Sequence, residues 1–208
     1  MAGRREAILE AARASFEEHG YGATTIELIA ERSGASNGSI YHHFGSKDGI
    51  LAALYASALG SYQGELLALL REHADDAEGG IRAGVVHHLE WVEAHPHETR
   101  TLFEHRQTLE RTPRAGDLRE QNRAALEEVR AWAARHVEAG AIRDLGAAAG
   151  AVWFGPAQVV ARDWMAGRLR GEPTALAPAL AEAAWRSSSA RSTSACSARW
   201  PSRSCRAT

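Results

Sequence analysis

The spacing of apolar residues predicts helices along the whole chain and strands nowhere. Apolar side chains recur three and four positions apart, which puts them on one face of a helix. Ile26, Ile29 and Ala30 share one such face, and Ile40 and Phe44 share another. The alternation of apolar and polar positions that marks a half-buried strand is missing from the sequence. We therefore predict an all-α fold.

Glycine, proline and polar clusters divide this pattern into nine helices. The first is predicted over 4–19, and the next two flank the turn Ser33-Gly34-Ala35. Six further helices are predicted over 47–75, 81–94, 97–110, 117–139, 147–167 and 174–185. Three helices followed by six indicate one domain over 1–46 and a second over 47–186.

The segment 24–44 carries the clearest functional signal. Thr24 is predicted to cap the first of its two helices, with Glu27 completing a capping box, and Ser36 is predicted to cap the second. Gly34 suits the left-handed conformation that ends a helix. Two helices joined by a short turn that contains glycine are typical of a helix-turn-helix, whose second helix enters the major groove of DNA. The segment therefore predicts a DNA-binding protein.

Five motifs follow one another through this region without a gap: Ile8-Leu9-x-Ala11-Ala12, Phe16-x-x-x-Gly20-Tyr21, Thr24-Thr25-x-x-x-Ile29-Ala30, Ser36-x-Gly38-x-Ile40-Tyr41-x-His43-Phe44 and Ser46-Lys47-Asp48-x-Ile50-Leu51. With these motifs, residues 4–55 resemble the N-terminal domain of the TetR (tetracycline repressor) family of transcription regulators. The resemblance implies an all-helical homodimer that represses transcription. Its N-terminal helices would bind a palindromic double-stranded operator, and its later helices would bind a small-molecule effector and the second protomer.

The candidate DNA-binding residues surround the second helix of the motif. Asn37 lies in its first turn, where its amide can pair with an adenine edge, and Gly38 allows close approach of the backbone. Tyr41 and His42 are predicted to contact phosphate, and the family resemblance assigns the same role to Lys47. The full set is Thr24, Thr25, Ser36, Asn37, Gly38, Ser39, Tyr41, His42 and Lys47.

Charge adds little general attraction to DNA. The chain has a formal net charge of −2, and residues 1–50 hold five basic and seven acidic side chains. Phosphate binding is therefore expected to rest on backbone N–H groups at the helix N-termini near Thr24, Ser36 and Ser46.

Large aromatic side chains gather in the later helices and suggest a pocket for an apolar or aromatic effector. Polar neighbours could orient such a ligand. The candidate pocket residues are His88, Trp91, Phe103, Arg106, Trp132, Trp153 and Gln158. Ordinary core and dimer packing is the alternative explanation for the same aromatic residues. The helices predicted over 147–167 and 174–185 are expected to form the dimer interface.

No metal site, cofactor or enzymatic activity is predicted. Neighbouring histidines such as His87 and His88 point about 100° apart on a helix, which disfavours a shared ion. The sequence has no nucleophile–base signature and no glycine-rich phosphate loop. The competing interpretation is a helical small-molecule-binding or metal-sensing protein whose DNA-binding head is vestigial.

The two ends of the chain differ in character. The N-terminus lacks an apolar signal core, and no apolar run reaches membrane-spanning length, so we expect a cytoplasmic protein with no membrane contact. Residues 187–208 contain eight serines, four arginines and no acidic residue. This composition predicts a disordered tail. It is either a cationic arm or the product of a shifted reading frame.

Overall fold

The computed structural model describes residues 2–110 and 115–190, and it confirms the all-α prediction. The helices are α1 (Ala2–Ala23), α2 (Ile26–Ser33), α3 (Asn37–Phe44), α4 (Lys47–Glu72), α5 (Ala77–Ala94), α6 (Pro96–Glu104), α7 (Arg106–Leu109), α8 (Ala115–Glu138), α9 (Ala149–Met165) and α10 (Ala177–Ser188). The single turn α7 follows α6 after one residue, so the two together fill the helix predicted over 97–110. The described helices thus follow the predicted order of three and then six.

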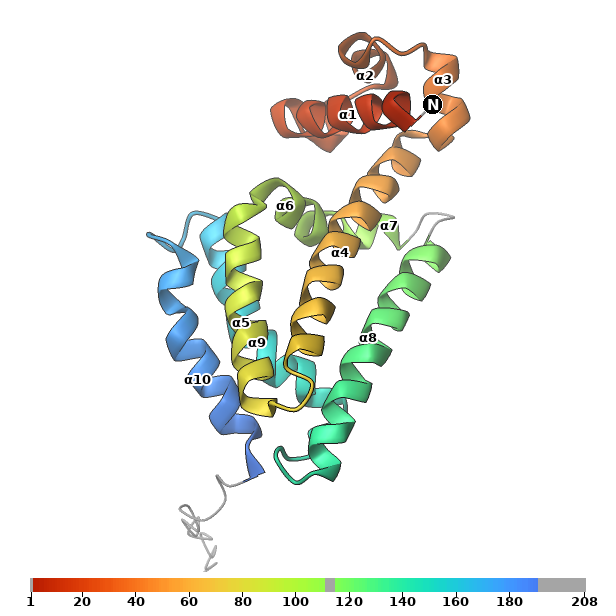
Figure 1. Cartoon of the computed structure of the whole chain (residues 1–208). Helices are drawn as coiled ribbons and strands as arrows, with labels where there is room; N and C mark the ends of the chain where they lie inside the picture. The colour runs from red at the N-terminus through yellow and green to blue at the C-terminus, as the bar shows by residue number, and fades with distance from the viewer. Residues whose placement is uncertain (1, 111–114, 191–208) are drawn as a thin grey trace, which may run out of the picture.

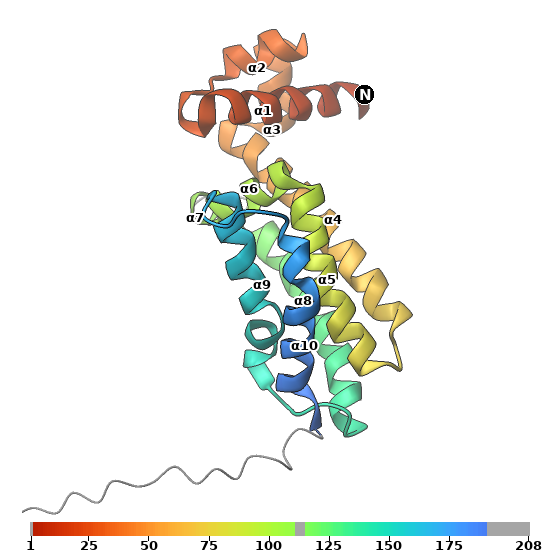
Figure 2. The same cartoon turned by 90° about the vertical axis from the view of Figure 1, so that its left-hand side faces the viewer.

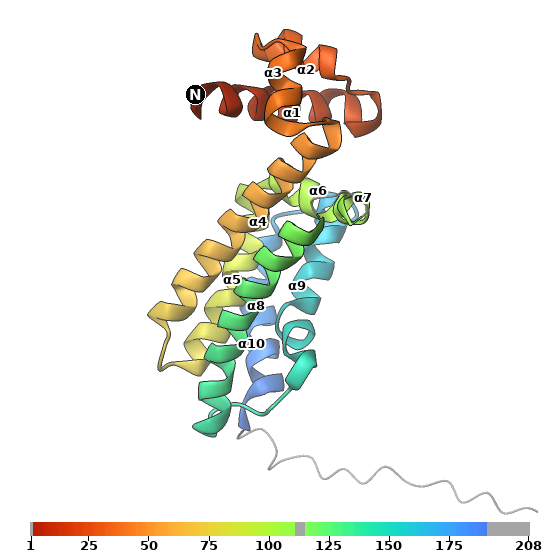
Figure 3. The ribbon, with the colours of Figure 1, turned by 90° about the vertical axis from the view of Figure 1, so that its right-hand side faces the viewer.

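The long helix α4 joins two groups of helices. Figure 1 shows α1, α2 and α3 together at one end of α4, while the later helices lie beside its remaining length. Figures 2 and 3 show the same separation from two further sides. We call the first group the head and the second group the body.

The head has a small apolar core of its own. Ile8 of α1, Ile29 of α2 and Ile40 of α3 are fully buried in one apolar cluster. The helical spacing predicts this burial for Ile29 and Ile40. Ile50 of α4 joins this head core, whereas Leu66 of the same helix belongs to the body core. The start of α4 is therefore packed into the head, and the division at residue 46 remains a prediction.

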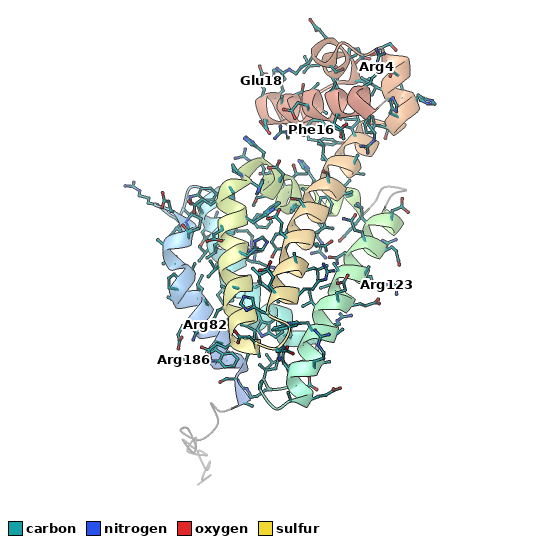
Figure 4. The ribbon with its side chains drawn as sticks, viewed as in Figure 1. Arg4, Phe16, Glu18, Arg82, Arg123 and Arg186 are labelled. Carbon is teal, nitrogen blue, oxygen red and sulfur yellow. The ribbon has the colours of Figure 1, made fainter. Side chains whose placement is uncertain are left out.

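The body is built around α5, which packs against α4, α9 and α10. Ion pairs bridge the outer edges of α5 and α10, where Figure 4 labels Arg82 and Arg186. Arg82 pairs with Glu182, and Arg186 Nε donates to the same carboxylate over 2.5 Å. These groups are partly solvent-exposed, so the apolar contacts beneath them contribute most of the stability.

Gly80 fixes the approach of α8 to α5, and Gly80→Ala should destabilise the body. A Cβ at this position would lie 2.4 Å from Trp132 Cζ2. The indole cannot move freely, because Trp132 Nε1 donates to the His73 carbonyl over 3.0 Å. Overpacking of this kind costs about 1–3 kcal/mol. We expect thermal denaturation to show a melting temperature lower by roughly 2–4 °C per kcal/mol.

A glycine on the open side of α4 gives the matched control for this substitution. A Cβ at Gly64 would meet no described atom within 4 Å. Gly64→Ala should leave the melting temperature unchanged or raise it, because alanine favours a helix by up to about 1 kcal/mol over glycine. If Gly80→Ala and Gly64→Ala have the same melting temperature, the Trp132 side chain can move away from a Cβ at position 80 without loss of stability.

The last described residues correct the predicted tail. The prediction of disorder from residue 187 is wrong for residues 187–190, because α10 continues to Ser188 and this serine is fully buried. Ser188 Oγ donates to the Ala184 carbonyl and accepts from Trp153 Nε1 over 2.8 Å. Arg143 N donates to the Ser188 carbonyl, and Ala190 N donates to the Ala141 carbonyl. Residues 191–208 lie outside the described part of the chain.

None of the helices within residues 2–110 and 115–190 has both the length and the apolar content that crossing a bilayer requires.

Candidate DNA-binding face and effector cavity

The first helix of the motif begins one residue later than the sequence predicts. Its N-cap is Thr25, which has extended dihedral angles and whose side-chain oxygen accepts from Leu28 N over 3.2 Å. Thr24 is instead buried, with its hydroxyl 2.9 Å from the carbonyl oxygens of Ser15 and Gly20. This correction removes Thr24 from the candidate DNA contacts, because its side chain closes the end of α1 inside the head.

The turn between α2 and α3 has the predicted geometry. Gly34 ends α2 in the left-handed conformation, at φ 65° and ψ 15°. Ser36 caps α3 and accepts a hydrogen bond from Ser39 N over 3.2 Å. The cap leaves the first backbone N–H groups of α3 directed outward, where an anion can bind them.

Helix α3 separates a buried face from an exposed one. Ile40 and Phe44 are buried in the head core, at 0% and 4% exposure. On the opposite side Tyr41 is 52% exposed. The other predicted contacts that are exposed are Thr25, Ser36, Asn37, Gly38 and His42, while Ser39 is half-buried. These side chains are available to a major groove, and their contacts with DNA remain a prediction.

Lys47 does not fit the predicted role of a phosphate ligand. Its ammonium group donates to the carbonyl oxygens of Tyr21 and Thr24 over 2.8 Å each, and to that of Gly22 over 3.4 Å. An ammonium group has three N–H donors, and these three acceptors occupy them all. Lys47 therefore joins the start of α4 to the end of α1. We call these contacts the lysine clasp.

Tyr21 adds a second link at the same point. Its hydroxyl donates to the Asp48 carboxylate, and its ring lies 4.5 Å from the Lys47 ammonium. Burial, followed by the hydrogen bond to Asp48, raises the pKa of the Tyr21 hydroxyl well above its ordinary value. The phenol therefore stays protonated and remains a donor at neutral pH.

Two arginines at the start of α1 lie near α3 and are not among the residues predicted from the motif. Arg4 and Arg5 are both exposed, and Figure 4 labels Arg4 on this side of the head. The Arg5 guanidinium carbon lies 5.5 Å from the centroid of the Phe44 ring. The sequence signal was the basic pair itself, but its distance from 24–44 along the chain concealed its position beside the motif.

Two adjoining cavities lie in the body. The smaller has a volume of about 430 Å³ and the larger about 720 Å³. Helices α4, α8 and α9 contribute to both, and α5 and α6 contribute to the smaller one. The residues that line both cavities are Leu59, Tyr62, Asn122 and Gln158. Their volumes lie within the range of about 300–1,000 Å³ that is usual for ligand sites.

Six of the seven predicted pocket residues line these cavities. The smaller cavity includes His88, Trp91, Phe103, Arg106 and Gln158, and the larger includes Trp153 and Gln158. The seventh needs a correction. The Trp132 ring packs in the body core against Gly80 and is 3% exposed, so its indole supports α5 and α8 from the core.

The pair of Tyr62, which is half-buried, and His88, which is buried, forms part of the smaller cavity's wall. Tyr62 Oη lies 2.9 Å from His88 Nδ1, and the Tyr62 ring stacks on His87. Burial, with a lesser effect from His87, lowers the pKa of His88 to about 4. Burial also raises the pKa of Tyr62. Both groups are therefore neutral at pH 7.

Within residues 2–110 and 115–190, no group of three or more His, Cys, Asp or Glu side chains is placed to hold a metal ion.

A helix-turn-helix head is linked by one long helix to a body with ligand-sized cavities, an arrangement that suits a protein that binds both DNA and a small molecule. Residues 8–54 match the family model described as bacterial regulatory proteins, tetR family. Over these residues the chain is similar to the DNA-binding domain of TetR-family transcription regulators.

Individual relatives agree with this assignment. The transcriptional repressor AcnR of Corynebacterium glutamicum is 48% identical over 50 residues, which are 24% of this chain and 27% of AcnR. The repressor KstR2 of Mycobacterium tuberculosis is 51% identical over 45 residues, or 22% of each chain. The chain thus spans about a quarter of the length of the curated relatives it matches. A TetR-family regulator from Marinobacter aquaeolei has the same fold, with a TM-score of 0.72 and 18% identity over 89% of this chain and 95% of that one.

Proposed function

We propose that the chain is a transcriptional repressor that binds a palindromic operator as a homodimer and leaves it when a small-molecule effector enters the body. The observation that carries this proposal is the exposed face of α3 within a TetR-family head. The names of AcnR and KstR2, both repressors, support the direction of regulation. Operator DNA, the effector and a second protomer are the proposed partners, and a cytoplasmic location follows from this function.

The path from effector to operator would run through α4 and α6. Helix α6 lines the smaller cavity with Leu102 and Phe103. The same helix reaches the head, because His97 Nδ1 lies 2.9 Å from Glu17 Oε1 of α1. A second link joins Arg13 Nη1 to Glu98 Oε1 over 3.6 Å. A ligand that displaces α6 would therefore shift the head and change the spacing of the two recognition helices in a dimer.

A DNA-binding assay should distinguish base recognition by Asn37 from phosphate contact by Arg4, because the first affects sequence preference and the second affects salt dependence. We expect Asn37→Ala to lose preference at one base pair, at a cost of about 1–3 kcal/mol. Arg4→Met should weaken binding to all sequences and reduce the slope of log K against log salt by roughly 0.9. The measurement is a gel-shift titration over several salt concentrations, with the DNA that flanks the chain's own gene.

Arg123→Ala gives the control for that titration. Arg123 is exposed on α8 and pairs with Glu120 and Glu127 of its own helix, so its loss should change neither affinity nor salt slope. Wild-type protein that fails to bind this DNA and other candidate operators would favour the vestigial head instead.

The proposed dimer interface lies on the outer faces of α9 and α10. Val159 is 51% exposed on α9, and Leu176, just before α10, is 39% exposed. Val159→Glu should convert the dimer to a monomer at micromolar concentration, because it would bury two unpaired carboxylates at an isologous contact. Sedimentation velocity measures this. Ala68→Glu, on an exposed position of α4, is the control, and a wild-type monomer would contradict the proposed assembly.

A further inference from the structure

The two adjoining cavities differ in the residues that surround them. The larger cavity has an aliphatic wall, which includes Leu66, Leu67, Leu126, Val129, Val137 and Ile142. Its four charged lining residues, Arg130, Glu138, Arg143 and Asp144, balance one another in formal charge. This cavity therefore offers apolar area and no preference for either sign of charge.

The smaller cavity has a cationic side and is more polar than the larger one. Among the described residues that line it, the charged ones are Arg106, Arg119, Arg162 and Glu110, so arginines outnumber carboxylates. Arg106 Nε lies 3.3 Å from Glu110 Oε1, which leaves two arginines without a carboxylate among the lining residues. Arg119 makes no hydrogen bond or ion pair with any residue in the described part of the chain. Its charge is available to an anion.

Unused polar atoms in the wall of the smaller cavity support the same conclusion. His88 Nε2, Trp91 Nε1 and Thr99 Oγ1 are buried and have no hydrogen-bond partner among the described residues. The Trp91 indole is a donor only. His88 is neutral, and if the Tyr62 hydroxyl donates to Nδ1 then Nε2 carries the remaining proton. A buried donor without a partner destabilises the fold. Small rotations of these side chains would let them donate to an oxygen atom of a ligand, and the new hydrogen bonds would offset that destabilisation.

We propose that the effector is an amphipathic anion, with an aliphatic chain in the larger cavity and an anionic headgroup at the arginines of the smaller one. The four residues that line both cavities provide the passage between the two parts of the ligand. This assignment rests on the proposed function and names the ligand class of its effector site. A carboxylate and a phosphate monoester share the required headgroup chemistry.

The test compares headgroups on one chain length by isothermal titration calorimetry, with the full-length protein and without DNA. The probes are dodecanoate, dodecyl phosphate and dodecylammonium, each below its critical micelle concentration, and 1-dodecanol below its solubility limit. We expect one or both anions to bind at least tenfold more tightly than the alcohol and the amine to bind least. Whichever anion binds more tightly identifies the headgroup. Equal affinity for dodecanoate, dodecyl phosphate and 1-dodecanol would overturn the proposal, as would no binding by any of them.

Chain length tests the larger cavity separately. Among octanoate, decanoate and dodecanoate, each methylene should tighten binding by up to about fourfold, the value that follows from burying one CH₂ group. Ala125→Trp should remove this gain, because Ala125 lines the larger cavity and the indole would fill it. Ala124→Trp, on an exposed position of the same helix, is the control and should bind like wild type. If both variants lose the gain in affinity with ligand length equally, the aliphatic chain of the ligand does not lie in the larger cavity.

Charge removal tests the headgroup site. The double variant Arg119→Gln/Arg162→Gln should weaken anion binding at least tenfold and leave 1-dodecanol binding unchanged. Both side chains are exposed, so the fold should tolerate the change. Unchanged anion affinity would overturn the assignment. Operator binding is measured separately by gel shift: an anion that binds without releasing DNA would contradict the proposed regulation and leave the ligand class intact.

Discussion

A chain that ends at Arg186 should melt several degrees below a chain that ends at Ala190. The shorter chain loses Ser188, whose hydroxyl accepts from the buried Trp153 Nε1 and whose carbonyl accepts from Arg143 N. It also loses the bond from Ala190 N to the Ala141 carbonyl. A buried donor left without a partner costs about 1–3 kcal/mol, and each further lost bond costs about 1 kcal/mol. Thermal denaturation should show a fall of roughly 2–4 °C per kcal/mol.

Ser188→Ala in the longer chain isolates the contribution of the hydroxyl group. It keeps the backbone bonds of residues 187–190 and removes only the acceptor of Trp153 Nε1. We expect it to melt between the two chain lengths. If the chains ending at Arg186 and Ala190 melt together, the packing of Ser188 against α9 contributes nothing to stability.

The same residues explain why sequence pattern failed at this end of the chain. Three consecutive serines have the composition of a solvated tail, and composition describes the average behaviour of such segments. The partner that orders Ser188 is Trp153, 35 positions earlier. No local pattern reports a contact of that length. The spacing of apolar residues correctly predicted the burial of Ile29 and Ile40, because side chains three and four positions apart lie on the same face of a helix.

The cap of α2 shows a second limit of local reasoning. Thr24 and Thr25 are equally good caps by residue type. Gly20 decides between them, because its backbone at φ 76° and ψ 157° breaks the regular helix of α1 and turns residue 24 inward. The bend at Gly20 thus determines that Thr25 is exposed and that Thr24 is hydrogen-bonded to buried carbonyl oxygens. The sequence predicts only that a helix ends at Gly20.

Aromatic composition predicted the presence of cavities in the body better than it predicted their walls. Trp153 lines the larger cavity, while Trp132, of the same residue type, supports the core through Gly80. Burial alone does not separate them, at 4% and 3% exposure. The arginines of the smaller cavity escaped notice because Arg119 and Arg162 lie on different helices, far apart in sequence. The sequence therefore predicted an apolar or aromatic effector, whereas our proposal adds an anionic headgroup to an aliphatic chain.

Lys47→Met should destabilise the head and weaken operator binding without lowering its salt dependence. Methionine keeps most of the apolar stem and removes the three donors of the lysine clasp, leaving the carbonyls of Tyr21, Gly22 and Thr24 to other partners. Hydrogen bonds from a charged donor contribute about 1.5–3 kcal/mol each, and solvent access to Lys47 reduces this value. We expect a loss of about 2 kcal/mol in the free energy of unfolding, measured by urea denaturation.

Salt titration of operator binding separates the clasp from a phosphate contact. A lysine that neutralises a phosphate releases a counterion, so its removal would lower the slope of log K against log salt by roughly 0.9. Removal of the clasp should instead weaken binding equally at all salt concentrations, because a less stable head presents α3 for less of the time. Arg4→Met provides the contrast, with a reduced slope and unchanged stability. A Lys47→Met protein with wild-type stability and a reduced slope would return Lys47 to the DNA-binding surface.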